Sequence, residues 1–182
     1  SGGNAVFNPE KLDWVNQQHI GRLTTDDLAG RLRPWLERAG VWSEEFSTTR
    51  RAWFLAVVEL FKPRIKRLDQ FVPEAMPLLS ASIDYDPAAV ARHLKPEIGA
   101  PLDALRDAFA SLDAFTAEAL EKTLRDLAEA RGLKAAALIH ATRVAVTGRA
   151  ASPGLFETLE LIGRDRVVER MGEAVRRVSS SA

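Results

Sequence analysis

The stretch TRVAVTGRAASPGLFETLELIG, residues 142–163, contains the pattern that decides the fold class. One apolar run ends at Gly148, and a second apolar run follows Ser152-Pro153-Gly154. Glycine is favoured just past the end of a helix, and proline is favoured at the first position of the next helix. The stretch therefore predicts two helices joined by a short turn, with Ser152 as the N-cap, Pro153 at the first helical position and Gly154 at the second.

Apolar residues at helical spacing, bounded by residues typical of helix ends, recur along the rest of the chain. The expected N-caps of these helices include Thr24, Asp86 and Thr116. We expect further helices at about residues 25–39, 47–61, 87 onward, 102–112, 117–130, 133–146 and 165 onward. No useful length of sequence alternates apolar and polar residues with the period of a strand. The predicted fold class is all-α.

Composition narrows the classes of function. The chain has 182 residues, with 25 basic and 25 acidic side chains. It contains no cysteine, and this absence excludes disulfides and thiolate metal sites. No apolar run approaches the ~20 residues of a membrane span, so we expect a cytoplasmic protein without a membrane partner. His19, His93 and His140 stand apart from any catalytic or metal-binding motif. The sequence therefore predicts no catalytic residue and no metal site.

Two groups of cations could bind an anionic partner despite the balanced charge. The first is KPRIKR, residues 62–67, and the second is Arg143 with Arg149. On charge alone, a solvated helix face is the simpler interpretation of both.

The four tryptophans could stack on bases, but their apolar neighbours favour other roles. We expect Trp14, Trp35 and Trp53 in the core and Trp42 partly exposed.

Three ordered segments carry a family resemblance: VFNPEKLDWVNQQHI at residues 6–20, VVELFKPRIKRLDQF at 57–71 and RVAVTGRAASPGLFETLELIGRDRVVERM at 143–171. Together they resemble the C-terminal part of bacterial glutamyl-tRNA synthetase, a class I aminoacyl-tRNA synthetase. The HIGH-like and KMSKS-like signatures of the family's ATP-binding domain are absent. The resemblance implies a fragment that is inactive alone and holds no cofactor, from a parent that ligates glutamate to tRNA(Glu) with ATP and magnesium in the missing domain.

The resemblance also implies an organisation and a partner. Residues 1–27 would end the region that contacts the tRNA stem, residues 28–79 would form a first helical anticodon-binding subdomain, and residues 80–182 would form a second. The implied partner is the anticodon loop of tRNA(Glu), bound by a monomer that does not bind DNA.

Individual roles follow from the same resemblance. Arg64 matches the arginine that reads the third anticodon base, where its donors suit the acceptors of cytosine and not the N–H groups of guanine. Arg143 matches the position that contacts the first anticodon base together with the Ser-Pro-Gly turn. We expect the remaining contacts as follows: Ser152, Pro153 and Gly154 at a helix start open to the RNA, Leu155 and Phe156 as apolar surface against a base, and Lys62, Lys66, Arg67 and Arg149 as candidate phosphate contacts.

Two alternatives belong to other classes of protein. A helical protein–protein interaction module without RNA binding would present an exposed apolar groove. A helix-turn-helix DNA-binding module would need a basic recognition helix, which the balanced charge disfavours.

Overall fold

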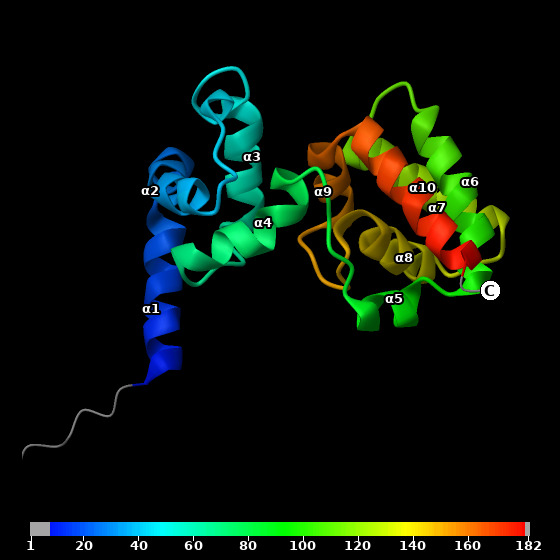
Figure 1. Cartoon of the computed structure of the whole chain (residues 1–182), viewed down its shortest axis with the longest axis horizontal. Helices are drawn as coiled ribbons and strands as arrows, with labels where there is room; N and C mark the ends of the chain where they lie inside the picture. The colour runs from blue at the N-terminus through cyan, green and yellow to red at the C-terminus, as the bar shows by residue number, and fades with distance from the viewer. Residues whose placement is uncertain (1–7, 181–182) are drawn as a thin grey trace, which may run out of the picture. The chain divides into compact units, whose positions relative to one another are not determined.

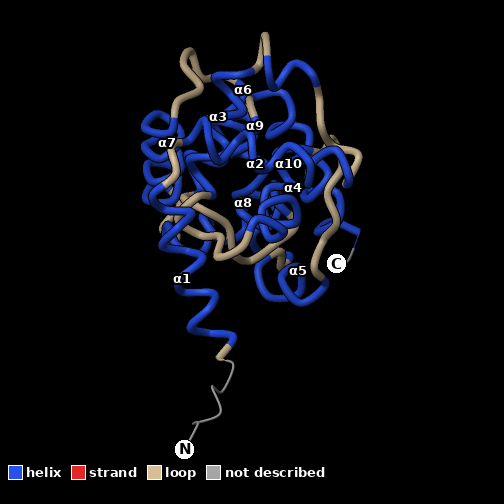
Figure 2. Tube along the Cα trace, turned by 90° about the vertical axis from the view of Figure 1, so that its left-hand side faces the viewer, coloured by secondary structure: helices blue, strands red, loops and turns tan. Residues whose placement is uncertain are grey.

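The computed structural model describes residues 8–180, and within that range it contains helices and no strand (Figures 1 and 2). This confirms the predicted all-α fold class. No helix in the described part of the chain combines the length and hydrophobicity needed to cross a bilayer. The elements, with η for 3-10 helices, are α1 Pro9–Arg22, α2 Thr25–Arg38, η1 Glu44–Ser47, α3 Arg51–Phe61, η2 Leu68–Gln70, α4 Phe71–Leu79, α5 Pro87–His93, η3 Pro96–Ile98, α6 Gly99–Ala110, α7 Ala117–Ala130, α8 Ala135–Thr147, α9 Leu155–Ile162 and α10 Arg164–Ser180.

The chain divides into two compact units, the first ending at Ala75 and the second beginning at Met76. This division falls inside α4, a few residues before the boundary at residue 79 expected from the sequence. The functional subdivision, including the stem-contact role of residues 1–27, stays a prediction, and residues 1–7 of that region lie outside the described residues.

Side-chain caps begin three helices where the sequence predicted them. The Thr24 hydroxyl accepts a hydrogen bond from the Asp27 N–H at 3.1 Å, and Asp86 accepts one from the Ala88 N–H at 2.9 Å. Thr116 does the same for α7 at 3.3 Å. Each cap satisfies an N–H group that the first helical turn leaves without a partner.

The first unit is built on the apolar faces of α2 and α3. Its fully buried side chains include Leu28, Leu32, Leu36, Val57, Val58, Phe61, Ile65 and Phe71. Burying each such side chain contributes about 1.5–3 kcal/mol. The expected start of α3 near residue 47 is wrong, because residues 44–47 form η1 and place Phe46 flat against Phe54, with ring centroids 4.9 Å apart.

The tryptophans, all in the first unit, only partly follow the prediction. Trp14 is 60% exposed, so its assignment to the core is wrong; Ile20 is the buried residue of α1. Trp35 and Trp53 are half-buried, and each lies under an arginine guanidinium, Arg38 at 5.1 Å and Arg50 at 4.1 Å. Trp42 is partly exposed, as predicted.

In the second unit, α10 packs along α6 and also contacts α8 and α9 (Figure 1). Gly99 permits the close approach of α6 and α10, because a Cβ there would lie 3.2 Å from Cγ1 of Val178. The fully buried core of this unit includes Leu102, Leu105, Phe109, Leu120, Leu124, Leu138, Val144, Leu159, Val167 and Met171.

A buried arginine on α10 fixes the end of α4. Arg170 is 4% exposed and donates to the carbonyls of Pro77 at 2.8 Å, Val146 at 2.8 Å, Ser80 at 2.8 Å and Ala81 at 3.3 Å. Burial lowers its pKa to about 10, so the side chain is still charged near neutral pH. Four carbonyl oxygens therefore take the place of an acidic partner.

Candidate nucleic-acid interface

The loop after α3, residues 62–67, is held from several sides. Ile65 is fully buried and anchors the loop in the core of the first unit. The Gln70 side-chain oxygen accepts hydrogen bonds from the N–H groups of Lys66 at 2.8 Å and Arg67 at 3.3 Å. The Gln17 amide of α1 donates to the Pro63 carbonyl at 3.2 Å. The backbone that carries Arg64 is therefore fixed before any ligand binds.

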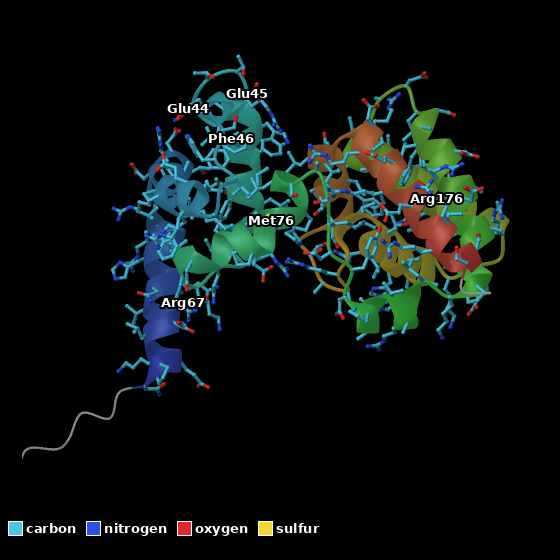
Figure 3. The ribbon with its side chains drawn as sticks, viewed as in Figure 1. Glu44, Glu45, Phe46, Arg67, Met76 and Arg176 are labelled. Carbon is cyan, nitrogen blue, oxygen red and sulfur yellow. The ribbon has the colours of Figure 1, made fainter. Side chains whose placement is uncertain are left out.

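The cations of this loop fall into two groups. Arg64 and Lys66 are exposed, and neither side chain hydrogen-bonds or pairs with any residue of the described range. Lys62 donates to the Leu23 carbonyl at 2.8 Å. Arg67 lies beside α1 (Figure 3) and pairs with Asp69 at 3.1 Å and with Asp13 at 3.4 Å.

These contacts change what each cation offers a ligand. Arg67 is electrically compensated, and its bond to Asp69 together with the two carboxylate charges raises its pKa. Lys62 already satisfies a backbone carbonyl and is half-buried. Arg64 and Lys66 remain as the cations of the loop with donors directed to solvent.

In the second unit, the turn between α8 and α9 is organised by Arg143. Its Nη1 donates to the Pro153 carbonyl at 2.8 Å and also contacts the Ser152 hydroxyl and carbonyl. The Thr147 hydroxyl continues the network, since it donates to the Arg143 carbonyl at 2.7 Å and accepts from the Arg149 N–H at 3.2 Å. The structure therefore brings Arg143 and the predicted Ser-Pro-Gly turn together.

The start of α9 differs from the sequence prediction. The helix begins at Leu155 with Gly154 as its N-cap, so Ser152 is not the cap and Pro153 and Gly154 are not helical. The physical reason is that the Ser152 hydroxyl bonds to Arg143 and to the Pro153 carbonyl, and so it does not reach the N–H groups of α9.

The expected apolar surface against a base is also wrong. Leu155 is 3% exposed and Phe156 is 9% exposed, because both side chains pack into the core of the second unit. Pro153 is buried as well, whereas Gly154 is exposed. The turn therefore presents backbone and polar atoms, and apolar stacking surface is absent from its described residues.

Sequence reasoning missed Glu157, which shapes the exposed side of this turn. A Cβ on Gly154 would lie 2.2 Å from Oε2 of Glu157, so the carboxylate folds over the glycine. The position, three residues after the N-cap Gly154, is where a helix favours an acid, but the predicted N-cap at Ser152 concealed this spacing. The carboxylate would repel a phosphate here and accept a hydrogen bond from a base N–H group.

Arg149 lies beside a second feature of the same unit. It is half-buried and lines a pocket of about 230 Å³ with Thr147 and Asp84. The backbone at Gly148, which precedes it, is left-handed, with φ of 74°. Arg149 is thus placed next to the turn, where its backbone N–H donates to the Thr147 hydroxyl.

Comparison with known proteins assigns the chain to a protein family. Residues 27–175 match the family described as anticodon binding domain. The chain belongs to this family.

Its relatives are glutamate–tRNA ligases. The chain is 38% identical over 174 residues to the enzyme of Roseiflexus castenholzii, covering 94% of the chain and 34% of that protein. It is 34% identical to the enzyme of Chloroflexus aurantiacus, covering 98% of the chain and 36% of that protein. A crystal structure of a glutamate tRNA ligase from Elizabethkingia meningosepticum shares the fold, with a TM-score of 0.83, 23% identity, and coverage of 94% of this chain and 33% of that one. The chain thus spans about a third of the length of these relatives.

Proposed function

We propose that this chain is the anticodon-reading part of a glutamate–tRNA ligase and that it binds the anticodon loop of tRNA(Glu). The family and the names of the relatives support this proposal. In the full-length ligase, we expect ATP and magnesium to act in a domain outside this chain. The chain itself would supply RNA binding, would work as a monomer without DNA or membrane partners in the cytoplasm, and would hold no cofactor.

One observation carries the assignment of Arg64 as the reader of the third anticodon base. Its guanidinium is exposed without a partner in the described residues, while the loop beneath it is fixed by Ile65 and Gln70. Because the backbone is already fixed, binding has to order only the Arg64 side chain, and its planar fork loses less entropy per hydrogen bond than a lysine would. Cytosine presents two adjacent acceptors on its Watson–Crick edge and guanine presents N–H donors there, so Arg64 would favour anticodons that end in C.

The α8–α9 turn would contact the first anticodon base through Gly154 and Glu157. Arg143 would act as a positioning residue, because its guanidinium binds the Ser152 and Pro153 carbonyls. Loss of Arg143 would then weaken binding through disorder of the turn.

The test compares RNA stem-loops whose anticodons end in C or in G, with the wild type, Arg64→Gln and Lys66→Gln measured at one salt concentration. A glutamine amide both donates and accepts, so Arg64→Gln should narrow the preference for C by roughly one to two orders of magnitude, the range of a bidentate base contact in DNA. Lys66→Gln removes the same charge from the same loop and should weaken both RNAs equally, as a phosphate contact does. Equal weakening of the two RNAs by Arg64→Gln would contradict the role given to Arg64.

A further inference from the structure

A group of cations in the second unit lies outside every residue assigned above. It consists of Arg92, His93, Lys95 and His140, called here the α5–α8 basic patch. Arg92 and His93 end α5, Lys95 follows it, and His140 lies in the middle of α8, which packs against α5. The rings of His93 and His140 stack, with centroids 5.0 Å apart and planes at 22°.

Positive charge in this patch is not compensated by the protein. Arg92, Lys95 and His140 are exposed, and no carboxylate of the described residues pairs with them. Burial lowers the pKa of His93, and the charges of His140, Arg92 and Lys95 lower it further. The charges that act on His93 thus come from cationic or imidazole groups, and a bound anion would reduce the repulsion among them.

The position of the patch connects it with the α8–α9 turn. His140 precedes Arg143 by three residues on α8, and residues at this spacing share a helix face. The second unit exposes no large apolar side chain in the described range, since the exposed ones, Leu12 and Trp14, belong to α1. A protein–protein interface usually has large apolar side chains at its centre, whereas RNA phosphates bind to positive charges and hydrogen-bond donors.

Resting on the proposed function, we propose that the α5–α8 basic patch is a second RNA contact, which binds the phosphate backbone beside the anticodon turn. Phosphates neutralise Arg92 and Lys95 and favour the protonated form of His93, which stacks on His140. Burial and the neighbouring positive charges disfavour protonated His93 in the free protein, and a bound phosphate would offset this effect. The pKa of His93 would therefore be higher in the complex, and affinity would rise as the pH falls through that pKa.

The first experiment measures binding of the tRNA(Glu) anticodon stem-loop to the whole chain against salt concentration. Arg92→Gln/Lys95→Gln should weaken binding and reduce the slope of log affinity against log salt by about 1.4, at roughly 0.7 per phosphate contact on single-stranded RNA. Arg131→Gln/Arg176→Gln removes the same charge from two exposed positions, the C-cap of α7 and α10, and should change the slope little. The double substitution Arg92→Gln/Lys95→Gln should lower the affinity for a stem-loop with a scrambled anticodon by the same factor as for the native stem-loop, because phosphate contacts do not read sequence.

The second experiment repeats the measurement from pH 5.5 to 7.5. Wild-type affinity should be higher at the acidic end, by up to roughly fivefold, the upper range for an exposed ion pair. The variant His93→Gln/His140→Gln should flatten this dependence, and circular dichroism would check that it folds.

The outcomes separate the two proposals. If the wild type binds the stem-loop but Arg92→Gln/Lys95→Gln leaves both affinity and salt slope unchanged, the patch is not an RNA contact and the proposed function stands. If the wild type binds no RNA, the proposed function fails and this inference fails with it.

Discussion

Substitution of Gly148 by alanine gives the sharpest structural test, because this residue both ends α8 and opens the α8–α9 turn. Its φ of 74° costs a non-glycine residue about 1–2 kcal/mol. A Cβ would also lie 2.0 Å from the Asp84 carbonyl oxygen and 3.3 Å from Cα of Tyr85, so a backbone segment must move. Such overpacking costs about 1–3 kcal/mol.

Movement of that segment would break its bonds to α8. The Asp86 N–H donates to the Gly148 carbonyl at 2.9 Å, and a bond of this kind contributes about 1 kcal/mol. Together the effects predict a loss of about 3–6 kcal/mol in the free energy of unfolding.

Gly132 provides the matched control. Its φ is 64°, yet a Cβ there would meet nothing within 4 Å, so Gly132→Ala should cost only the backbone term of about 1–2 kcal/mol. Urea titrations followed by far-ultraviolet circular dichroism measure both variants. Equal destabilisation by the two alanines would refute the claim that residues 84–86 pack rigidly against the end of α8.

Further expectations concern binding, stability and activity. Gly154→Val should displace the Glu157 carboxylate and weaken stem-loop binding. The free energy of unfolding should change by less than about 1 kcal/mol, because the displaced group is the end of an exposed, flexible side chain. Normal RNA affinity of this variant would mean that the turn is only a helix start. Arg170→Met should lower the free energy of unfolding by at least about 3 kcal/mol, since four carbonyls lose their donor. Arg166→Met removes hydrogen bonds of 3.0 and 3.5 Å made by a half-buried side chain and should lower it less. Denaturant titration compares the two variants. The chain alone should show no glutamate-dependent pyrophosphate exchange, and a signal above that of buffer would overturn the assignment of catalysis to another part of the ligase.

Local patterns predicted most of the helices, although not α1 or α4, and they did not predict the exposure of the side chains. Thr24, Asp86 and Thr116 cap their helices because the stabilising bonds lie within a few residues. Trp14 was misplaced because helical spacing does not reveal whether another element covers that face. Leu155 and Phe156 were misplaced for the converse reason, since a family motif does not state which of its side chains are buried.

In the candidate site, too, the sequence identified residues but not the contacts that they make with distant segments. Arg64 and the Ser-Pro-Gly turn could be named from the sequence, whereas the pairing of Arg67 and the engagement of Arg143 depend on partners from other segments. Arg170 carried a readable signal, because it falls on the buried stripe of α10 beside Val167 and Met171. An arginine on such a stripe indicates a bound acceptor, but the sequence could not identify the end of α4 as that acceptor.

The anchoring of α4 by Arg170 has a consequence for hydrogen exchange. The helix begins in one compact unit and ends in the other, and its final carbonyls are held by α10. When α10 opens, Pro77, Ser80 and Ala81 lose their donor, and the last turn of α4 loses its support. Amide protons of Leu78 and Ser80 should therefore exchange in step with those of α10, while the amide of Val72 follows the first unit. A nine-residue helix would then contain two kinetic classes of amide, divided within a few residues of Met76.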